Sequence, residues 1–93
     1  MAAKSRILVT RDDGKPSFTV SGQTAKAITA LVLAGQHGVT ALEVSSWAFR
    51  FAAYCHLLRR NGLDIETVKE SHKGGWYGRH VLHTAVRLQP IYC

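Results

Sequence analysis

The sequence contains little cysteine and no long apolar run, and each shortage excludes a class of protein. Its 93 residues include only two Cys. Two cysteines do not make the disulfide framework on which small secreted domains depend, which favours a reducing compartment. The longest apolar run, Ala30 to Gly35, is far shorter than the roughly 20 residues of a membrane-spanning helix. With no apolar signal region near the first Lys, we expect a cytoplasmic protein with no membrane partner.

The sequence also lacks the common motifs of metal sites and enzymes. It has no C-x-x-C pair, and Cys55 and His56 are adjacent on an expected helix. His80 and His83 are three apart on an expected strand, so their side chains should face opposite sides. The segment SGQTAK lacks the glycine spacing and GK[ST] ending of a phosphate-binding loop. We therefore expect no bound metal, no cofactor and no enzymatic activity.

Positive charge exceeds negative charge by a factor of two. Twelve Lys and Arg stand against six Asp and Glu, giving a net charge of +6 and a pI near 9.8. This balance favours an anionic partner such as nucleic acid. The 46% hydrophobic content is enough for a packed core, and the length fits one domain over residues 1–93.

The first third of the chain predicts a hairpin and a helix. Strands are expected at Ile7 to Thr10 and Phe18 to Ser21, joined by a turn-rich connection that includes Asp13-Gly14. Apolar residues then recur at helical spacing from Gln23 to Ala34. Ser21 is a candidate N-cap for this helix and Gly35 a candidate stop.

The middle of the chain predicts two more helices. Thr40 and Glu43 have the spacing of a capping box, so a short second helix should begin at Ala41. The pair Ser45-Ser46 offers a break before a third helix, which runs from Trp47 to about Arg60 and stops at Asn61-Gly62.

Two strands should follow, at Leu63 to Val68 and His80 to Leu88, joined by the loop KESHKGGWYGR. The order hairpin, three helices, strand, loop, strand is that of an α+β winged helix. We predict an N-terminal hairpin extension over 1–21, a three-helix core over 22–61, a β-wing over 63–88 and a tail over 89–93.

The third helix and the loop carry the candidate DNA-binding residues. Arg50 lies where a recognition helix presents side chains to base edges, and Ser46 lies at a helix start that suits a phosphate. The loop is basic and holds aromatic rings, which suits a phosphate backbone or a minor groove. The predicted set is Ser46, Arg50, Tyr54, Arg60, Lys69, Lys73, Trp76 and Arg79.

Each of these residue types has a structural alternative. Lys and Arg in a loop are often only solvated, and Arg59 and Arg60 in a last helical turn complement the helix dipole without any ligand. Trp76 could cover the core, and core packing is the more frequent role for Trp47.

The segment AFRFAAYCHLLRRNGLDIET resembles a family of small helix-turn-helix, winged-helix domains found widely in bacteriophages and prophages. Their third helix and first wing strand follow the pattern R-hydrophobic-A-A-x-hydrophobic-x-x-L-R-x-x-G-x-x-I-x-T, and VTALE matches the start of their second helix. The resemblance covers roughly 22–88 and implies a DNA-binding regulator or phage accessory protein. The stretch from Thr40 to Arg50 is about two residues shorter than usual, so the second helix should be truncated or merge into the third.

Two functions remain as hypotheses. The first is a transcriptional regulator or accessory factor that binds double-stranded DNA. The second is an adaptor that docks on a host or phage protein through its apolar first helix and through Phe49 and Leu57. Winged helices often read two half-sites, which favours a homodimer, although no heptad repeat is visible.

Overall fold

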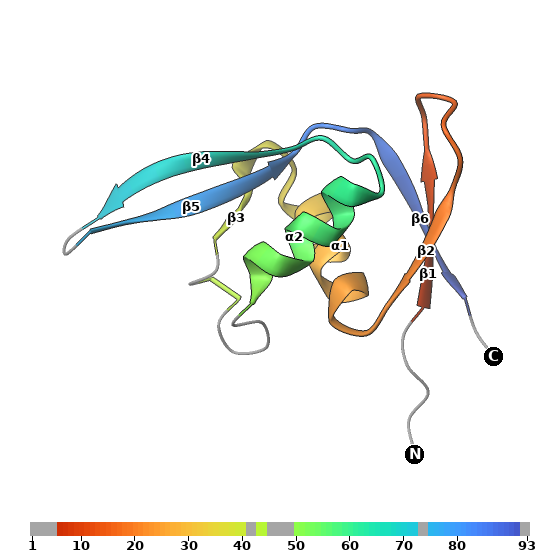
Figure 1. The fold of residues 1–93 in the computed structure, drawn as a ribbon, viewed down its shortest axis with the longest axis horizontal. Helices are drawn as coiled ribbons and strands as arrows, with labels where there is room; N and C mark the ends of the chain where they lie inside the picture. The colour runs from red at the N-terminus through yellow and green to blue at the C-terminus, as the bar shows by residue number, and fades with distance from the viewer. Residues whose placement is uncertain (1–5, 41–42, 45–49, 73–74, 92–93) are drawn as a thin grey trace, which may run out of the picture.

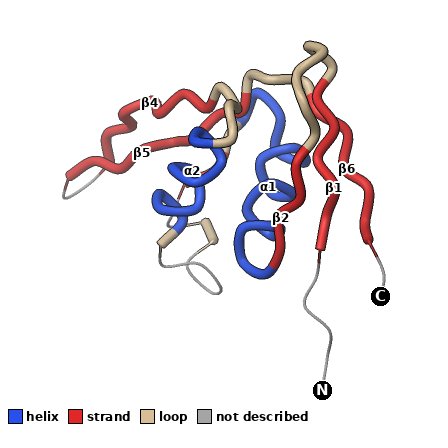
Figure 2. The backbone as a smooth tube through the Cα atoms, turned by 45° about the vertical axis from the view of Figure 1, so that its right-hand side comes forward, coloured by secondary structure: helices blue, strands red, loops and turns tan. Residues whose placement is uncertain are grey.

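The computed structural model places its helices between two antiparallel sheets (Figure 1). It describes residues 6–40, 43–44, 50–72 and 75–91. Over these ranges the molecule measures 44 × 36 × 20 Å. The long dimension runs from the tip of one sheet, through the helices, to the other sheet, as Figure 2 also shows.

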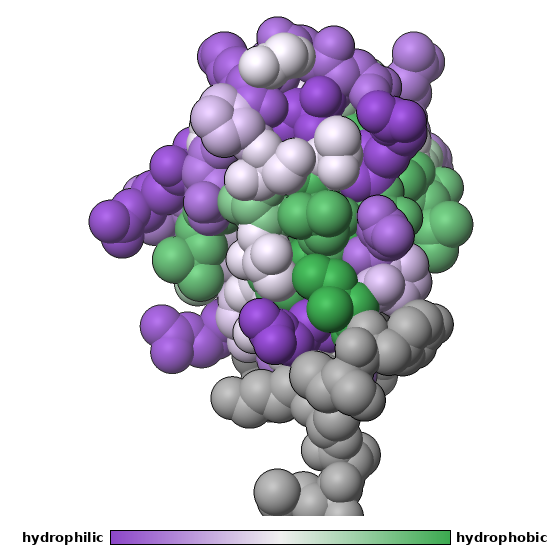
Figure 3. Space-filling view, turned by 90° about the vertical axis from the view of Figure 1, so that its right-hand side faces the viewer, coloured by the Kyte–Doolittle hydropathy of each residue, from purple (hydrophilic) through white to green (hydrophobic). Residues whose placement is uncertain are grey.

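The first sheet joins the two ends of the chain. Strands β1 (Arg6–Arg11) and β2 (Phe18–Ser21) form the predicted hairpin, and β6 (Val86–Ile91) pairs with the other edge of β1. Side chains alternate across this sheet, so Val9 and Val20 are buried against the helices. Figure 3 views the molecule from this side, where an apolar area lies between hydrophilic margins.

Two α-helices lie within the described ranges. The first, α1 (Gly22–Ala34), has Ser21 at its N-cap and Gly35 at its C-cap, as predicted, although no side-chain bond from Ser21 caps it. The second, α2 (Phe51–Arg60), packs on α1 and buries one stripe of its surface. A 3₁₀ turn, Gly35–His37, follows α1. The largest fully buried side chains, which form the centre of the core, are Phe51, Ile28, Leu31, Leu58 and Val9.

The second sheet forms the wing. Strand β5 (Gly75–Leu82) lies between β4 (Ile65–His72) and the short β3 (Val39–Thr40). All eight residues of β4 pair with β5, from Ile65 opposite Leu82 to His72 opposite Gly75. The β4–β5 hairpin projects away from the helices (Figure 1), with its root held by β3.

The predicted start of the third helix at Trp47 lies outside the described residues, but the prediction that the helix includes Arg50 is wrong. Arg50 has φ −106° and ψ 39°, which is not helical, and α2 begins at Phe51. The carbonyl of Arg50 accepts bonds from the backbone N–H groups of Ala53 and Tyr54, so Arg50 is the N-cap residue. The three-helix core is not shown, because the predicted second helix falls mainly on 41–42 and 45–49, which lie outside the described residues.

The predicted loop over 69–79 is also wrong. Except for 73–74, which lie outside the described residues, this segment belongs to β4 and β5. The hairpin extends away from the helical core, so its strands bury little apolar surface and consist mainly of polar residues. This polar composition resembles that of a loop. Backbone pairing of Lys69 with Gly78 and Glu70 with Tyr77 makes it a sheet.

The single strand predicted from His80 to Leu88 divides between the two sheets. The chain leaves β5 at Leu82 and enters β6 at Val86. Asp64 fixes this break, because its carbonyl accepts from the His83 N–H at 2.8 Å and its N–H donates to Thr84 Oγ1 at 2.8 Å. The expected tail over 89–93 is therefore, as far as Ile91, part of β6 and paired with β1.

Candidate nucleic-acid interface

Helix α2 has one buried face and one exposed face. Phe51, Cys55 and Leu58, at positions i, i+4 and i+7, form the buried stripe. Burial raises the pKa of the Cys55 thiol to about 12, so this cysteine is an apolar core residue and not a nucleophile at neutral pH. On the opposite side, His56, Leu57 and Arg60 are exposed. This exposed side of α2 is accessible to a DNA groove or to the surface of a protein partner.

Arg59 fixes the direction in which β4 leaves α2. Its Nε donates to the Ile65 carbonyl at 2.9 Å and its Nη2 to Thr67 Oγ1 at 2.6 Å. The Thr67 hydroxyl also bonds to Nδ1 of His80 at 3.0 Å. Sequence reasoning assigned Arg59 only to the helix dipole, and its true role had no local signal because both acceptors lie beyond the helix end.

His80 joins the wing to the core. Its ring is buried with its centroid 5.5 Å from that of Phe51. Burial lowers the pKa of His80, and the nearby charge of Arg59 lowers it further. The imidazole is therefore neutral at neutral pH, which suits a buried position between β5 and α2.

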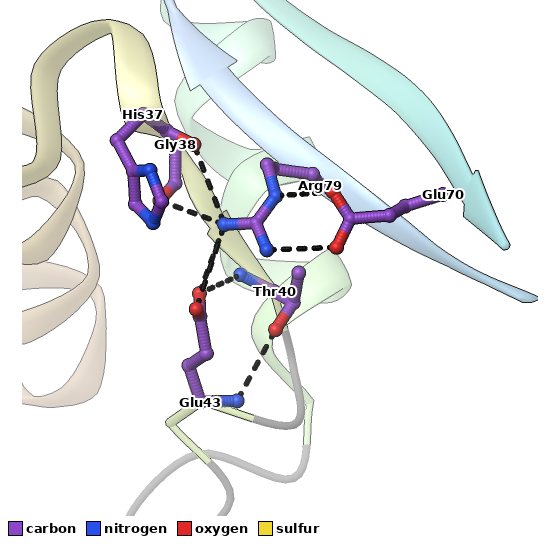
Figure 4. A network of polar contacts seen from close by, with 6 residues as sticks. All are labelled: His37, Gly38, Thr40, Glu43, Glu70 and Arg79. Carbon is purple, nitrogen blue, oxygen red and sulfur yellow. Dashed lines mark hydrogen bonds and ion pairs between the residues drawn. The ribbon is translucent and has the colours of Figure 1, made fainter. Parts of the chain in front are cut away.

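Arg79 is the centre of a polar network at the root of the wing (Figure 4). Its Nε and Nη2 donate to the two carboxylate oxygens of Glu70 at 2.7 and 2.8 Å. Its Nη1 donates to Glu43 Oε1 at 3.2 Å and to the carbonyls of His37 and Gly38 at 3.3 and 3.4 Å. The hydrogen bond to Glu70 is the main cause that raises the pKa of Arg79. The side chain is 16% exposed, so this guanidinium ties the wing to the turn before β3.

The predicted capping box is confirmed in its hydrogen bonds. The Thr40 N–H donates to Glu43 Oε1 at 2.9 Å, and the Glu43 N–H donates to Thr40 Oγ1 at 3.2 Å. Because Glu43 also bonds to Arg79, one carboxylate connects the capping box to the wing. The backbone N–H of Thr40 is the main cause that lowers the pKa of Glu43, and the charge of Arg79 adds to it.

This network predicts a pH dependence of stability. Because the pKa of Glu43 is lower in the folded state, its contribution is complete above about pH 4.5, the ordinary value for Glu, and is lost as pH falls through the lowered pKa. The Glu43→Gln variant should therefore lose stability less steeply with acid than the wild type. Urea unfolding at a series of pH values measures the slope.

The matched control is Asp13→Asn. The pKa of Asp13 is also lowered, chiefly by its hydrogen bond from Arg11, so this variant removes a separate part of the acid slope. An acid slope that is the same in Glu43→Gln as in the wild type, and smaller in Asp13→Asn, would show that the ionised form of Glu43 does not stabilise the fold.

A match to a family of known domains identifies the family of this chain. The family model is described as a winged helix domain and matches residues 17–91, most of the chain. The chain belongs to the winged helix family. No curated protein and no solved structure gave a significant match. The resemblance to winged helix-turn-helix domains is confirmed, and the phage-type origin stays a prediction.

The match assigns the chain a DNA-binding or regulatory fold in general terms. The matched part of this winged helix domain contains β2 and β6, whereas β1 precedes it although it lies between them in the sheet. Within the described ranges, no helix has both the length and the apolar character needed to cross a membrane. The same ranges bring no three His, Cys, Asp or Glu side chains together as metal ligands.

The predicted site residues of this winged helix domain differ in their exposure and contacts. Arg50 and Arg60 are exposed at the two ends of α2, and Lys69 is exposed on β4. Tyr54 is half-buried and packs against the core. Arg79 is held inside the wing network and is the clearest departure from the expected solvent-facing cation. Ser46, Lys73 and the side chain of Trp76 lie outside what the structure describes.

Proposed function

We propose that this winged helix protein binds double-stranded DNA, as a transcriptional regulator or accessory factor. The observation that supports this most strongly is the exposed face of α2 beside a projecting wing, on a chain of net charge +6. An α-helix with its side chains is about 10–12 Å in diameter, which fits a major groove about 12 Å wide. The buried stripe of α2 seats the helix on α1 and leaves the opposite face for the groove.

Arg50 is the proposed base-reading residue. It is exposed at the N-terminal end of α2, where recognition helices contact base edges. No hydrogen bond or ion pair joins its guanidinium to another of the described residues, so its donors can form a bidentate contact with a guanine. Arg60, at the other end of the helix, would contact phosphate together with Lys69 and Lys73 of the wing. Ser46, Tyr54 and Trp76 would add further contacts.

Arg79 has a different role in this proposal. Its donors are already used by Glu70, Glu43 and two backbone carbonyls, so a phosphate would have to displace those bonds. We assign Arg79 to positioning the wing relative to the turn before β3. The wing can then reach the backbone on one side of α2 at a fixed angle.

Binding to a random-sequence duplex library across a salt series, followed by selection of enriched sequences, tests the proposal. We expect steep salt dependence and an enriched motif. Arg50→Ala should reduce the discrimination between bases at one position of the motif by about 1–3 kcal/mol, whereas Lys69→Ala should weaken binding to all sequences alike. Absence of binding at low salt would reject DNA as the partner, and equal, sequence-blind losses in both variants would reject Arg50 as the base reader.

Exposed apolar side chains support a second candidate, a protein-binding adaptor. Leu57 on α2 is 43% exposed and Leu33 on α1 is 82% exposed. Bulky apolar groups are unusual where a helix meets phosphates, so Leu57 favours a protein partner. This candidate predicts binding that is insensitive to salt and is lost in Leu57→Asp. The homodimer, which would also cover apolar surface, stays a prediction.

A further inference from the structure

A hollow of about 450 Å³ lies where the β1–β2 turn meets the C-terminal end of α2. Its walls come from two segments far apart in the sequence, Arg11 with residues 15–18 in one and residues 60–62 in the other. The hairpin and the β4–β5 wing lie on different sides of α2 (Figures 1 and 2). A ligand in this hollow would therefore contact α2 at the end away from the wing tip.

The hollow carries an excess of positive charge. Three cations line it: Arg11, Lys15 and Arg60. The buried Arg11 is neutralised by Asp13, to which it donates at 3.1 and 2.7 Å. The side chains of Lys15 and Arg60 are exposed, and neither has a hydrogen bond or ion pair with the other described residues. The carboxylates of Asp12, Asp13 and Asp64 border a separate hollow beside the β5–β6 connection.

The end of α2 does not repel an anion as an open helix C-terminus would. Unsatisfied carbonyls at such an end carry partial negative charge. Here the Leu57 carbonyl accepts from the side chain of Asn61 at 3.0 Å, and the Arg59 carbonyl accepts from the Gly62 N–H at 2.8 Å. The Asn61 carbonyl accepts from Nη1 of Arg11 at 3.1 Å. The Asp13 carboxylate accepts from the Lys15 backbone N–H at 3.1 Å, but its charge is offset by Arg11, so Lys15 and Arg60 leave the hollow with a net positive charge.

We propose that this hollow binds a phosphate group through Lys15 and Arg60. This inference rests on the proposed function: the phosphate belongs to the DNA backbone beyond the end of α2. The β1–β2 hairpin then acts as a second wing. Arg11 does not contact the phosphate in this arrangement but holds the hairpin against Asn61 and Gly62, which sets the spacing of Lys15 and Arg60. Half-buried Phe18 supplies an apolar wall that a sugar can contact.

The test measures DNA affinity across a salt series for the wild type, Lys15→Gln and Arg6→Gln, with phosphate binding measured in parallel. Arg6 is the matched control, since it is an exposed cation at the opposite end of β1. Lys15→Gln should reduce the slope of log K against log salt by about one, because one phosphate contact is lost. Arg6→Gln should leave the slope unchanged. For the parallel probe, inorganic phosphate is titrated while the amide resonances of Lys15 and Gly62 are followed.

The outcomes distinguish failure of the phosphate site from failure of the proposed DNA-binding function. DNA binding with a reduced slope only in Lys15→Gln supports the site and the DNA backbone as its ligand. DNA binding with equal slopes in the wild type and both variants overturns the site and leaves the proposed function intact. If the wild type does not bind DNA, but inorganic phosphate shifts its amide resonances and Lys15→Gln abolishes these shifts, the site is supported with free phosphate as its ligand. The proposed function is then rejected. Neither DNA binding nor amide shifts overturns both.

Discussion

Phe51→Ala should destabilise the protein by about 3–5 kcal/mol, a large share of the roughly 5–15 kcal/mol that holds a small domain folded. The Phe51 side chain is 0% exposed and is the largest of the fully buried side chains. It seats the first turn of α2 against the core and packs beside the ring of His80. Removing it leaves a cavity at the point where the helix and the wing root meet, so both should loosen.

Urea unfolding followed by circular dichroism measures this loss. The control is Leu57→Ala on the same helix, where 43% of the side chain is already exposed and the expected loss is about 0.5 kcal/mol or less. A loss below about 1 kcal/mol in Phe51→Ala would mean that α2 is not seated on the core as described.

Gly38→Ala should cost about 2–5 kcal/mol, through two separate causes. Gly38 has φ 73° and ψ 179°, a region open almost only to glycine. A Cβ at this position would also lie 2.8 Å from the His80 carbonyl oxygen and 2.8 Å from Cγ2 of Val81. Because the carbonyl is part of β5, the strand itself would have to move, and the wing root would move with it.

Gly35→Ala separates the two causes. Gly35 also has a positive φ, 57°, but a Cβ there would meet nothing within 4 Å. It should therefore show the backbone cost of about 1–3 kcal/mol without the clash. Thermal unfolding of both variants gives the difference. If Gly38→Ala is no more destabilised than Gly35→Ala, the close approach of Gly38 to β5 is not tight.

Local sequence signals predicted the C-terminal ends of the helices and the N-terminal hairpin. Gly35 stops α1, Asn61-Gly62 follows the end of α2, and Thr40 with Glu43 forms the capping box, because each of these depends on residues a few positions apart. The strand expected at Phe18 to Ser21 has the same bounds as β2. These features depend on short-range chemistry that a single sequence displays.

Pairing between distant segments could not be predicted in the same way. The division of residues 80–91 between two sheets depends on Asp64, and the place of β6 depends on β1 at the other end of the chain. Arg79 was read as a solvent-facing cation because its partners at His37, Gly38 and Glu43 are more than thirty positions away. The prediction that Arg50, Arg60 and Lys69 are exposed cations is confirmed, and their contact with DNA stays a prediction. The predicted environment of Arg79 is wrong.

The central position of β1 has a consequence for how the chain folds. Its pairing with β6 brings Arg6 opposite Ile91, so this ladder closes a loop of nearly the whole chain. Such a contact carries a large loop-closure entropy and slows folding relative to local contacts. The β1–β2 and β4–β5 hairpins and the two helices can form from neighbouring residues, whereas β6 can pair with β1 only after all the residues between them have been synthesised. Until then β1 has an open edge, and the core residue Val9 lacks the neighbouring strand that later covers that side.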